Sequence, residues 1–413
     1  MKTALNKITV VFPAKTFRIN NHTAVKRITS IDLLRGLIMI IMALDHTRDY
    51  FHAGAFVNNP TDLNNTTVLL FFTRWITHFC APVFVLLAGT SAFISGRKKT
   101  KSQLSSFLVK RGLWLIILEI TILNFGWYFN PHFNYINLQV IWVLGVSMIV
   151  LAALIHLPEK MIMAIGLVMI FGHNLFDTIH VSGKGIDAFT WSVLHERGVF
   201  LLGKTTFNIS FPLIPWIGLM AVGYRLGNIF LPPYNSARRK GILINLGSAA
   251  ITLFIILRFI NRYGDPVSWA HQPSPVFTFL SFLNVTKYPP SLDYLLVTIG
   301  PSLIFLAVTE NVSNRFTKII SVYGRVPMLY YIVHIYLIHL LAMPAAMILG
   351  YRWTDLASFQ NSIHSVARLK DYGFNLGILY MIWAGIVAAL YPLCKWYDDY
   401  KTKNKSKWWL SYL

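Results

Sequence analysis

Long apolar blocks alternate with shorter polar connections along most of the chain. Each block runs for roughly 18 to 24 residues, the length at which a helix crosses the hydrocarbon core of a bilayer. The alternation of about ten residues that marks a barrel strand does not occur. The pattern therefore predicts an all-α, polytopic membrane bundle of about 10 transmembrane helices (10–11). The expected spans are residues 31–52, 70–95, 112–129, 138–157, 161–176, 209–231, 242–261, 292–309, 326–350 and 374–394.

Positive charge is divided unevenly between the two sets of connections. In this topology 25 Lys and Arg residues fall on the side of the two termini and nine on the other side. Short cytoplasmic loops carry such an excess, so we expect both termini in the cytoplasm and the chain in a bacterial inner membrane. The net charge of +21 then reflects membrane topology. We predict contact with a lipid bilayer and no binding of nucleic acid.

Composition agrees with a membrane protein. Hydrophobic residues make up 55% of the chain and charged residues 13%, whereas soluble domains carry about a quarter charged residues. Both cysteines, Cys80 and Cys394, fall in apolar spans, so no disulfide is expected. We divide the chain into a basic cytoplasmic tail at 1–27, a membrane domain at 28–394 and a second basic tail at 395–413.

Three predicted outer loops, at 177–208, 262–291 and 351–373, are long and rich in aromatic residues, Pro and His. Loops of this length in compact proteins are usually functional or disordered. Their aromatic content favours ordered lids over the outer face. The fifth span is the least regular, because Gly172, His173 and Asn174 interrupt its apolar pattern.

The first span carries an unusual group of ionisable residues: Asp45, His46, Arg48 and Asp49. Such residues are costly inside a membrane and mark functional sites. Helical spacing brings Asp45 next to Arg48 and Asp49, and His46 next to Asp49. The group can therefore neutralise its own charge. His46 lies about 9 Å from the outer end of the helix.

The second span places Arg74 and His78 four residues apart on one helix face, at a similar depth. Two antiparallel spans joined by a short loop are usually neighbours. We therefore expect His46 and His78 to converge on a pocket near the outer face. A purely structural, neutralised network is the alternative, but two histidines with four charges at one depth favour a functional site. A metal site of His46, His78 and Asp49 is conceivable; nothing in the spacing requires it, and we predict no metal.

Two other polar residues, His334 and Lys287, have two interpretations each. His334, about 12 Å inside the ninth span, either contacts substrate or bonds a neighbouring helix, and His339 is expected to be structural. Lys287 and Tyr288 lie in a Pro-rich outer turn. Lys287 either binds an anionic group or anchors the chain at the membrane interface.

Several stretches resemble a known family. Arg35 and His46 reproduce the Arg-x10-His spacing of membrane acyltransferases of the acyltransferase-three kind. Five stretches look more like the bacterial relatives of heparan-α-glucosaminide N-acetyltransferase, in the expected order between residues 30 and 339. They are SIDLLRGLIMIIMALDH, RWITHFCAPVFVLLAGTSA, FPLIPWIGLMAVGYRLG, TKYPPSL and GRVPMLYYIVHIYLIH.

The resemblance implies that an acyl group, in the first instance acetyl, passes from cytoplasmic acetyl-CoA or another acyl-CoA to a sugar or glycan on the outer face. The family's lysosomal member acetylates a terminal glucosamine. This chain departs from that pattern, in which Asn and Asp stand at the positions of His46 and His78. The family's active-site histidine lies in the intervening loop, where His52 is the only candidate.

Acyl transfer needs a base, because the attacking hydroxyl or amine must lose a proton. We predict His46 as this base, oriented by Asp49 or Asp45. His78 would carry a second proton or stabilise the oxyanion. Direct transfer and a covalent acyl-histidine are both compatible with these residues.

Binding roles follow from the same scheme. Arg48 and Arg74 keep the carboxylates charged and contact the acceptor. The residues expected to bind substrate are Arg48, Arg74, Lys287, Tyr288 and His334. Arg35 and Arg325 are expected to bind coenzyme A, together with the basic loop at 97–101.

Three other functions compete with acyl transfer. A proton-coupled secondary transporter of a small solute would also bury Asp, Arg and His, although no repeat of broken helices is visible. Haem could be held by His46, His78 and His334. A scaffold gives no reason to bury so many charges. The oligomeric state stays open, with a homodimer as one option.

Overall fold

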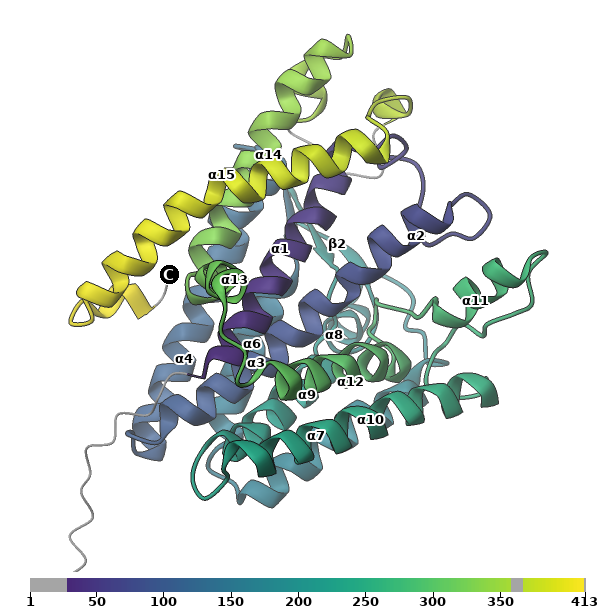
Figure 1. The fold of residues 1–413 in the computed structure, drawn as a ribbon. Coiled ribbons are helices and arrows are strands. Elements are labelled where there is room, and N and C mark those ends of the chain that lie inside the picture. Colours follow the sequence, from purple (N-terminus) through teal and green to yellow (C-terminus); the bar gives the residue numbers. More distant parts are fainter. Residues whose placement is uncertain (1–27, 358–366, 412–413) are drawn as a thin grey trace, which may run out of the picture.

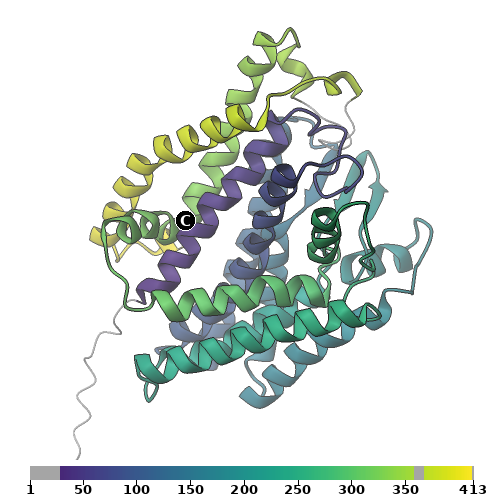
Figure 2. The same cartoon turned by 45° about the vertical axis from the view of Figure 1, so that its right-hand side comes forward.

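Every predicted apolar block is helical, either as one helix or as helical pieces in line (Figures 1 and 2). The computed structural model describes residues 28–357 and 367–411, so the predicted tail at 1–27 lies outside the described residues. The helices are α1 (Thr29–Phe51), α2 (Val68–Trp75), α3 (Cys80–Gly96), α4 (Lys101–Leu118), α5 (Asn124–Tyr128), α6 (Val140–Leu154), α7 (Glu159–Gly172), α8 (Ile186–Leu194), α9 (Ile214–Leu226), α10 (Ser236–Ile260), α11 (Pro275–Leu283), α12 (Leu292–Thr309), α13 (Arg315–Arg325), α14 (Pro327–Ile348) and α15 (Leu376–Lys403).

Short turns of other helix types join several of these pieces. A 3₁₀ turn, η1, connects α2 to α3, and a π-helical turn, η2, connects α4 to α5. These turns are η1 (Ile76–Phe79), η2 (Glu119–Leu123), η3 (His173–Phe176), η4 (Gly227–Phe230), η5 (Trp353–Asp355), η7 (Ala367–Leu369) and η8 (Trp408–Ser411). The predicted irregularity at Gly172 is the point at which α7 gives way to η3.

One helix has the predicted bounds, and two others extend beyond the predicted bounds. α12 occupies the predicted 292–309. α4 begins at Lys101 rather than at 112, because Thr100 and Gln103 form a capping box that starts a helix in the basic stretch. α15 continues to Lys403 without a break at 394.

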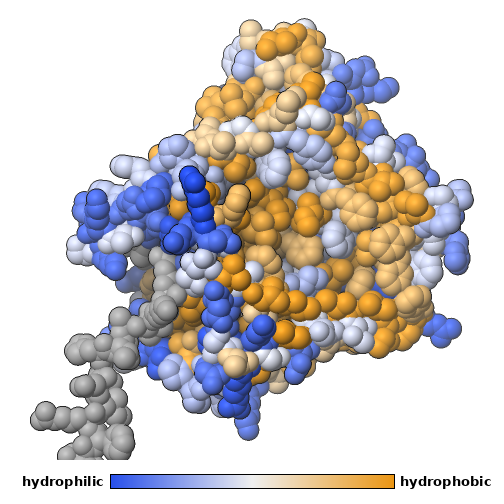
Figure 3. Space-filling view, viewed as in Figure 1, coloured by the Kyte–Doolittle hydropathy of each residue, from blue (hydrophilic) through white to orange (hydrophobic). Residues whose placement is uncertain are grey.

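Six helical stretches in the described part of the chain are long and apolar enough to cross a membrane. They are Val68–Gly96, Glu159–Phe176, Ser236–Ile260, Leu292–Thr309, Pro327–Ile348 and Leu376–Lys403. The remaining four predicted spans are also helical, and their crossing of the membrane stays a prediction, as does the side on which each terminus lies. Figure 3 shows apolar side chains over most of one face, with hydrophilic ones gathered around α13 and the nearby end of α15.

α1 lies at the centre of the bundle, in contact with α3, α12, α13, α14 and α15 (Figure 1). Glycines allow several helix pairs to approach so closely that a Cβ atom would meet the backbone of the partner helix. Small residues at crossings are typical of membrane helix packing. The facing pairs are Gly36 and Gly324, Gly89 and Gly223, Gly112 and Gly145, Gly166 and Gly218, and Gly247 and Gly300.

A small sheet, which the sequence pattern did not predict, covers one end of the bundle. Its strands are β1 (Tyr135–Leu138), β2 (Gly198–Leu202) and β3 (Thr205–Ile209). β3 is central, parallel to β1 and antiparallel to β2. The predicted lid at 177–208 contains α8, β2 and most of β3, and the lid at 262–291 contains α11. Both are therefore ordered, whereas part of the third lies outside the described residues.

Replacement of Gly324 by Ala tests the crossing of α13 with α1. A Cβ at this position would lie 1.9 Å from the carbonyl oxygen of Asp32, so the helices must separate. We expect a loss of about 1–3 kcal/mol of stability, measured as a lower thermal unfolding midpoint in detergent. Gly385→Ala on α15 is the matched control, because its Cβ meets no atom within 4 Å. An equal midpoint for both variants would contradict the close crossing.

Candidate active site at the end of α1

A cavity of about 960 Å³ lies beside the C-terminal half of α1. Its wall combines the charged residues of α1 and α2 with amide and aromatic side chains from helices, strands and loops that are far apart in sequence. The amides are Asn58, Asn59, Asn64, Asn137, Gln139, Asn208, Gln272 and Asn284. The aromatic residues are Phe84, Trp127, Tyr128, Phe211, Tyr288 and Tyr331.

A break in the second span presents His78 to this cavity. Pro82 has no N–H group, so the carbonyl of His78 loses its usual helical donor. The hydroxyl of Tyr294 donates to that carbonyl instead, at 2.8 Å. The backbone forms the 3₁₀ turn η1 here. The His78 side chain is 3% exposed, and its Nδ1 has no hydrogen-bond partner among the described residues.

Two carboxylates and two guanidinium groups neutralise one another beside the histidines. Arg48 Nη2 lies 3.0 Å from Asp45 Oδ1 and 2.6 Å from Asp49 Oδ1. Arg74 Nη1 lies 2.5 Å from Asp45 Oδ2. The side chain of Arg48 is 3% exposed and that of Arg74 is 13% exposed. The low-polarity surroundings therefore strengthen these ion pairs and make an unpaired charge costly. Asp45 thus joins α1 to α2.

His46 is held by a second histidine. Its Nδ1 lies 2.7 Å from Nε2 of His334 on α14, and the two rings are stacked with centroids 5.0 Å apart. Trp127 packs edge-on against His46 at 4.7 Å. His334 is fully buried, and its Nδ1 lies 2.8 Å from the carbonyl oxygen of Tyr330.

These bonds define the hydrogens on both rings in their neutral forms. The Tyr330 carbonyl can only accept, so Nδ1 of His334 carries a hydrogen and its Nε2 is an acceptor. His46 must then donate from Nδ1 to His334, which leaves a lone pair on Nε2 of His46. The nearby carboxylates are already neutralised by Arg48 and Arg74, so no unpaired anion favours a charged imidazole. His46 lines the cavity, and in this tautomer its Nε2 keeps an unshared lone pair.

Most predicted site residues meet at this cavity. His46 and His78 share it as expected, together with Asp45, Arg48, Asp49, Arg74, Lys287 and Tyr288. His334 is not among its lining residues and lies behind His46. The ring of His46 is oriented by His334, whereas Asp45 and Asp49 bond the arginines; the expected orientation by a carboxylate is thus not what the structure has.

The residues predicted to bind coenzyme A do not line this cavity. Arg35 donates to the Gly324 carbonyl and to Ser91, which ties α1 to α13 and α3. Arg325 forms an ion pair with Asp398 of α15 at 2.6 Å. His52, the loop histidine suggested by the family pattern, is also absent from the cavity wall.

Several lining residues were not identified from the sequence. Trp127 and Tyr331 lie in apolar blocks where nothing distinguishes them from core residues, and Asn137 and Asn208 belong to the unpredicted sheet. Arg197 comes from the lid at 177–208, and a single charged residue in a loop does not by itself indicate that the residue lines a cavity. No sequence pattern would have marked these positions.

Tyr288 carries a perturbed phenol. Burial by itself would raise its pKa, but the positive charges of Lys287 and Arg74 outweigh burial, so the pKa lies below its usual value. Arg197 and Lys287 each lie 5.2 Å from the centre of its ring. A phenol of lowered pKa is a strong hydrogen-bond donor, suited to a developing negative charge.

Comparison with known families agrees with this geometry. Residues 27–263 match the family model for heparan-alpha-glucosaminide N-acetyltransferase, catalytic. The chain belongs to this family. It is therefore an N-acetyltransferase-like enzyme, and its six candidate spans make it an integral membrane protein. A search of curated proteins finds no match.

Acetyl-CoA is the co-substrate of the family, and a glycan is its acceptor. The matched segment contains the ionic network and both cavity histidines. It ends before Lys287, Tyr288 and His334. The residue that orients His46 thus comes from beyond the segment that identifies the N-acetyltransferase family.

Removal of the charge at Asp45 tests the ionic network. Asp45→Asn leaves Arg48 and Arg74 without their shared partner, so we expect a loss of about 3–5 kcal/mol of stability. Urea or thermal unfolding in detergent measures it. Asp187→Asn, at an exposed position in the first turn of α8, should cost about 1 kcal/mol or less. Equal losses in the two variants would argue against the network.

Proposed function

We propose that the chain transfers an acyl group, in the first instance acetyl, from acyl-CoA to a hydroxyl or amine of a sugar or glycan. The observation that carries the proposal is the bond between His46 and His334, which leaves a lone pair on Nε2 of a histidine that lines the large cavity. Membership of the N-acetyltransferase family supports the reaction class.

In the proposed reaction, the hydroxyl oxygen or amine nitrogen of the acceptor attacks the thioester carbonyl. Nε2 of His46 takes the proton that this oxygen or nitrogen loses. Negative charge develops on the carbonyl oxygen. The Tyr288 hydroxyl and the ring of His78 are the proposed hydrogen-bond donors to it. The thioester bond then breaks, and the departing coenzyme A thiolate takes the proton from His46. Asp45 and Asp49 hold Arg48 and Arg74 toward the acceptor.

The cavity wall supports a carbohydrate acceptor. Its amide side chains can donate and accept hydrogen bonds to hydroxyl groups, and its aromatic rings offer flat apolar faces. Lys287 and Arg197 add positive charge at the same wall. We propose that this end of the bundle faces the outside and binds the acceptor.

The acyl donor is proposed to arrive from the opposite end. A smaller cavity of about 340 Å³ lies at the C-terminal end of α3, where Arg97, Lys99 and Lys101 line it. These three charges suit the phosphates of coenzyme A. Arg35 and Arg325 already bond neighbouring helices, so binding there would compete with those bonds. The two cavities have no lining residue in common. Transfer therefore requires a path through the bundle that leads from the smaller cavity to His46.

Substitution of His46 by Ala tests the base. Acyl transfer from acetyl-CoA to a panel of amino sugars and glycans should fall by about 10²–10⁴-fold, with binding of acetyl-CoA retained. His132→Ala, at an exposed histidine, is the control for loss of a histidine. If His52→Ala abolished turnover while His46→Ala retained it, the loop histidine would be the base instead.

A transport assay tests the competing function, a proton-coupled secondary transporter. Solute uptake into proteoliposomes without acyl-CoA would favour the transporter.

His334 has a separate test because it acts through His46. His334→Ala removes the acceptor for the Nδ1 hydrogen of His46, so the ring can turn or change tautomer. We expect kcat to fall about 10–100-fold with KM little changed, and the pH dependence of kcat to shift. In His334→Gln, the side-chain amide oxygen can take the place of the His334 Nε2 atom and accept the Nδ1 hydrogen of His46, so this variant should recover part of the rate. Identical rates and pH profiles in wild type and His334→Ala would contradict the positioning role.

A further inference from the structure

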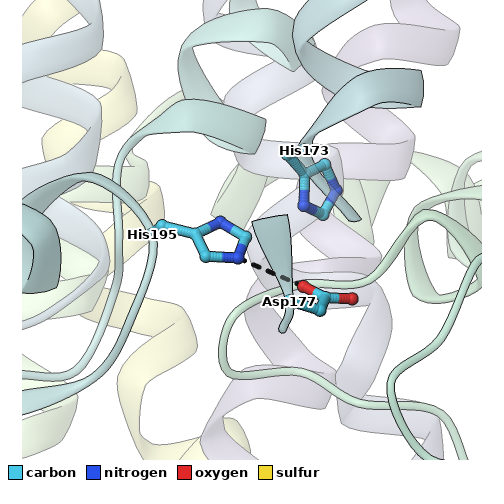
Figure 4. Close-up of side chains that lie close together, drawn as sticks. All are labelled: His173, Asp177 and His195. Atoms are coloured by element: carbon cyan, nitrogen blue, oxygen red, sulfur yellow. Dashed lines mark ion pairs between the residues drawn. The ribbon is translucent and has the colours of Figure 1, made fainter. Parts of the chain in front are cut away.

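A second cluster of polar side chains lies outside the large cavity, at the end of α7. It consists of His173, Asp177 and His195 (Figure 4). One ligand atom from each residue lies within 4.8 Å of the other two. Nε2 of His195 is 3.2 Å from Oδ1 of Asp177. None of the three lines the large cavity, so the proposed acyl transfer does not account for them.

The cluster is buried, and most of its polar atoms lack partners. His173 and His195 are each 1% exposed. Both ring nitrogens of His173 and Nδ1 of His195 have no hydrogen-bond partner among the described residues. Oδ1 of Asp177 also lacks a hydrogen bond of normal geometry there, although Nε2 of His195 lies 3.2 Å from it. Buried polar groups in native proteins are normally paired. A metal ion bound by one ring nitrogen of each histidine and by Oδ1 of Asp177 would supply a partner at the point where the three residues meet.

The donor set selects the ligand. Two imidazole nitrogens and one carboxylate oxygen are the three protein ligands of many zinc sites, with a fourth position open to water. Zinc bonds of about 2.0–2.2 Å put the ligand atoms of a tetrahedral site roughly 3.3 Å apart. The separation of 3.2 Å between His195 and Asp177 matches this value. Calcium and magnesium prefer sites made wholly of oxygen atoms.

A neighbouring amide holds the carboxylate in place. Asn174 Nδ2 donates to Oδ2 of Asp177 at 2.6 Å, which leaves Oδ1 directed toward the histidines. Oδ1 of Asn174 accepts from the backbone N–H of Leu292, at the start of α12, at 2.9 Å. Partners of this kind orient metal ligands and tune metal affinity. The cluster is therefore built into the junction of η3 and α12.

We propose that His173, Asp177 and His195 bind one zinc ion. The ion joins the end of α7 to the segment after α8, which leads directly to Arg197. Arg197 lines the large cavity and packs on the ring of Tyr288. The site thus fastens the lid that carries Arg197 to the membrane helices. This proposal does not depend on the proposed acyl transfer.

Zinc content of the full-length protein in detergent tests the site. After removal of loosely bound metal, we expect about one zinc per chain by elemental analysis, and a higher thermal midpoint with zinc than with a chelator. His173→Ala and His195→Ala should each lower zinc affinity at least about tenfold. His132→Ala, which removes an exposed histidine, should leave both values unchanged.

Two milder variants, Asp177→Asn and Asn174→Ala, allow zinc affinity to be measured if His173→Ala and His195→Ala do not fold. Asp177→Asn preserves the size of a ligand but removes its charge, and Asn174→Ala removes only the orienting amide. Each should lower zinc affinity by about 10–100-fold. A wild-type chain that neither contains nor binds zinc would overturn the proposal whatever the variants do. Folded variants that bind zinc as wild type does would also overturn it.

Discussion

The mutual neutralisation of charges on α1 and α2 is the constraint on which the site depends. Asp45 accepts from Arg48 on its own helix and from Arg74 on the next one. Within an apolar bundle neither arginine can give up its partner cheaply. This shared carboxylate sets the rotation of α2 against α1. With that rotation, His46 and His78 both reach one cavity, and the carboxylates of Asp45 and Asp49 beside them are paired with arginines.

The central position of α1 explains why its chemistry draws on so many elements. Facing glycines bring α13 against α1 near Gly36, and α14 follows directly after α13. That short connection carries His334 to the side of His46 that faces away from the cavity. Close packing thus converts a histidine of an apolar helix into the partner of the proposed base.

The loop layer completes the cavity and links it to the second cluster. The sheet contributes Asn137 and Asn208, while the segment after α8 contributes Arg197. His195 lies two residues before Arg197 and belongs to the group of His173 and Asp177. Residues of both polar groups therefore come from one segment, 177–208.

Apolar block length predicted the helical stretches of this bundle, because each helix needs a run of apolar residues whatever its neighbours are. Helical spacing likewise identified Asp45, His46, Arg48 and Asp49 as one group, and Arg74 with His78 as a second. Spacing within one helix is a local property. Helix ends in polar stretches, such as the start of α4, depended on capping that hydropathy does not report.

The pairing of His46 with His334 and the grouping of His173, Asp177 and His195 were decided only by tertiary structure. The first pair is separated by 288 residues. In the second group, His173 and Asp177 lie at the turn that follows α7, and His195 lies in the lid at 177–208. Such contacts depend on which helix faces pack together and how loops fold back over them. The sequence by itself determined which side chains are costly to bury, and only the packed bundle determined which partners offset that cost.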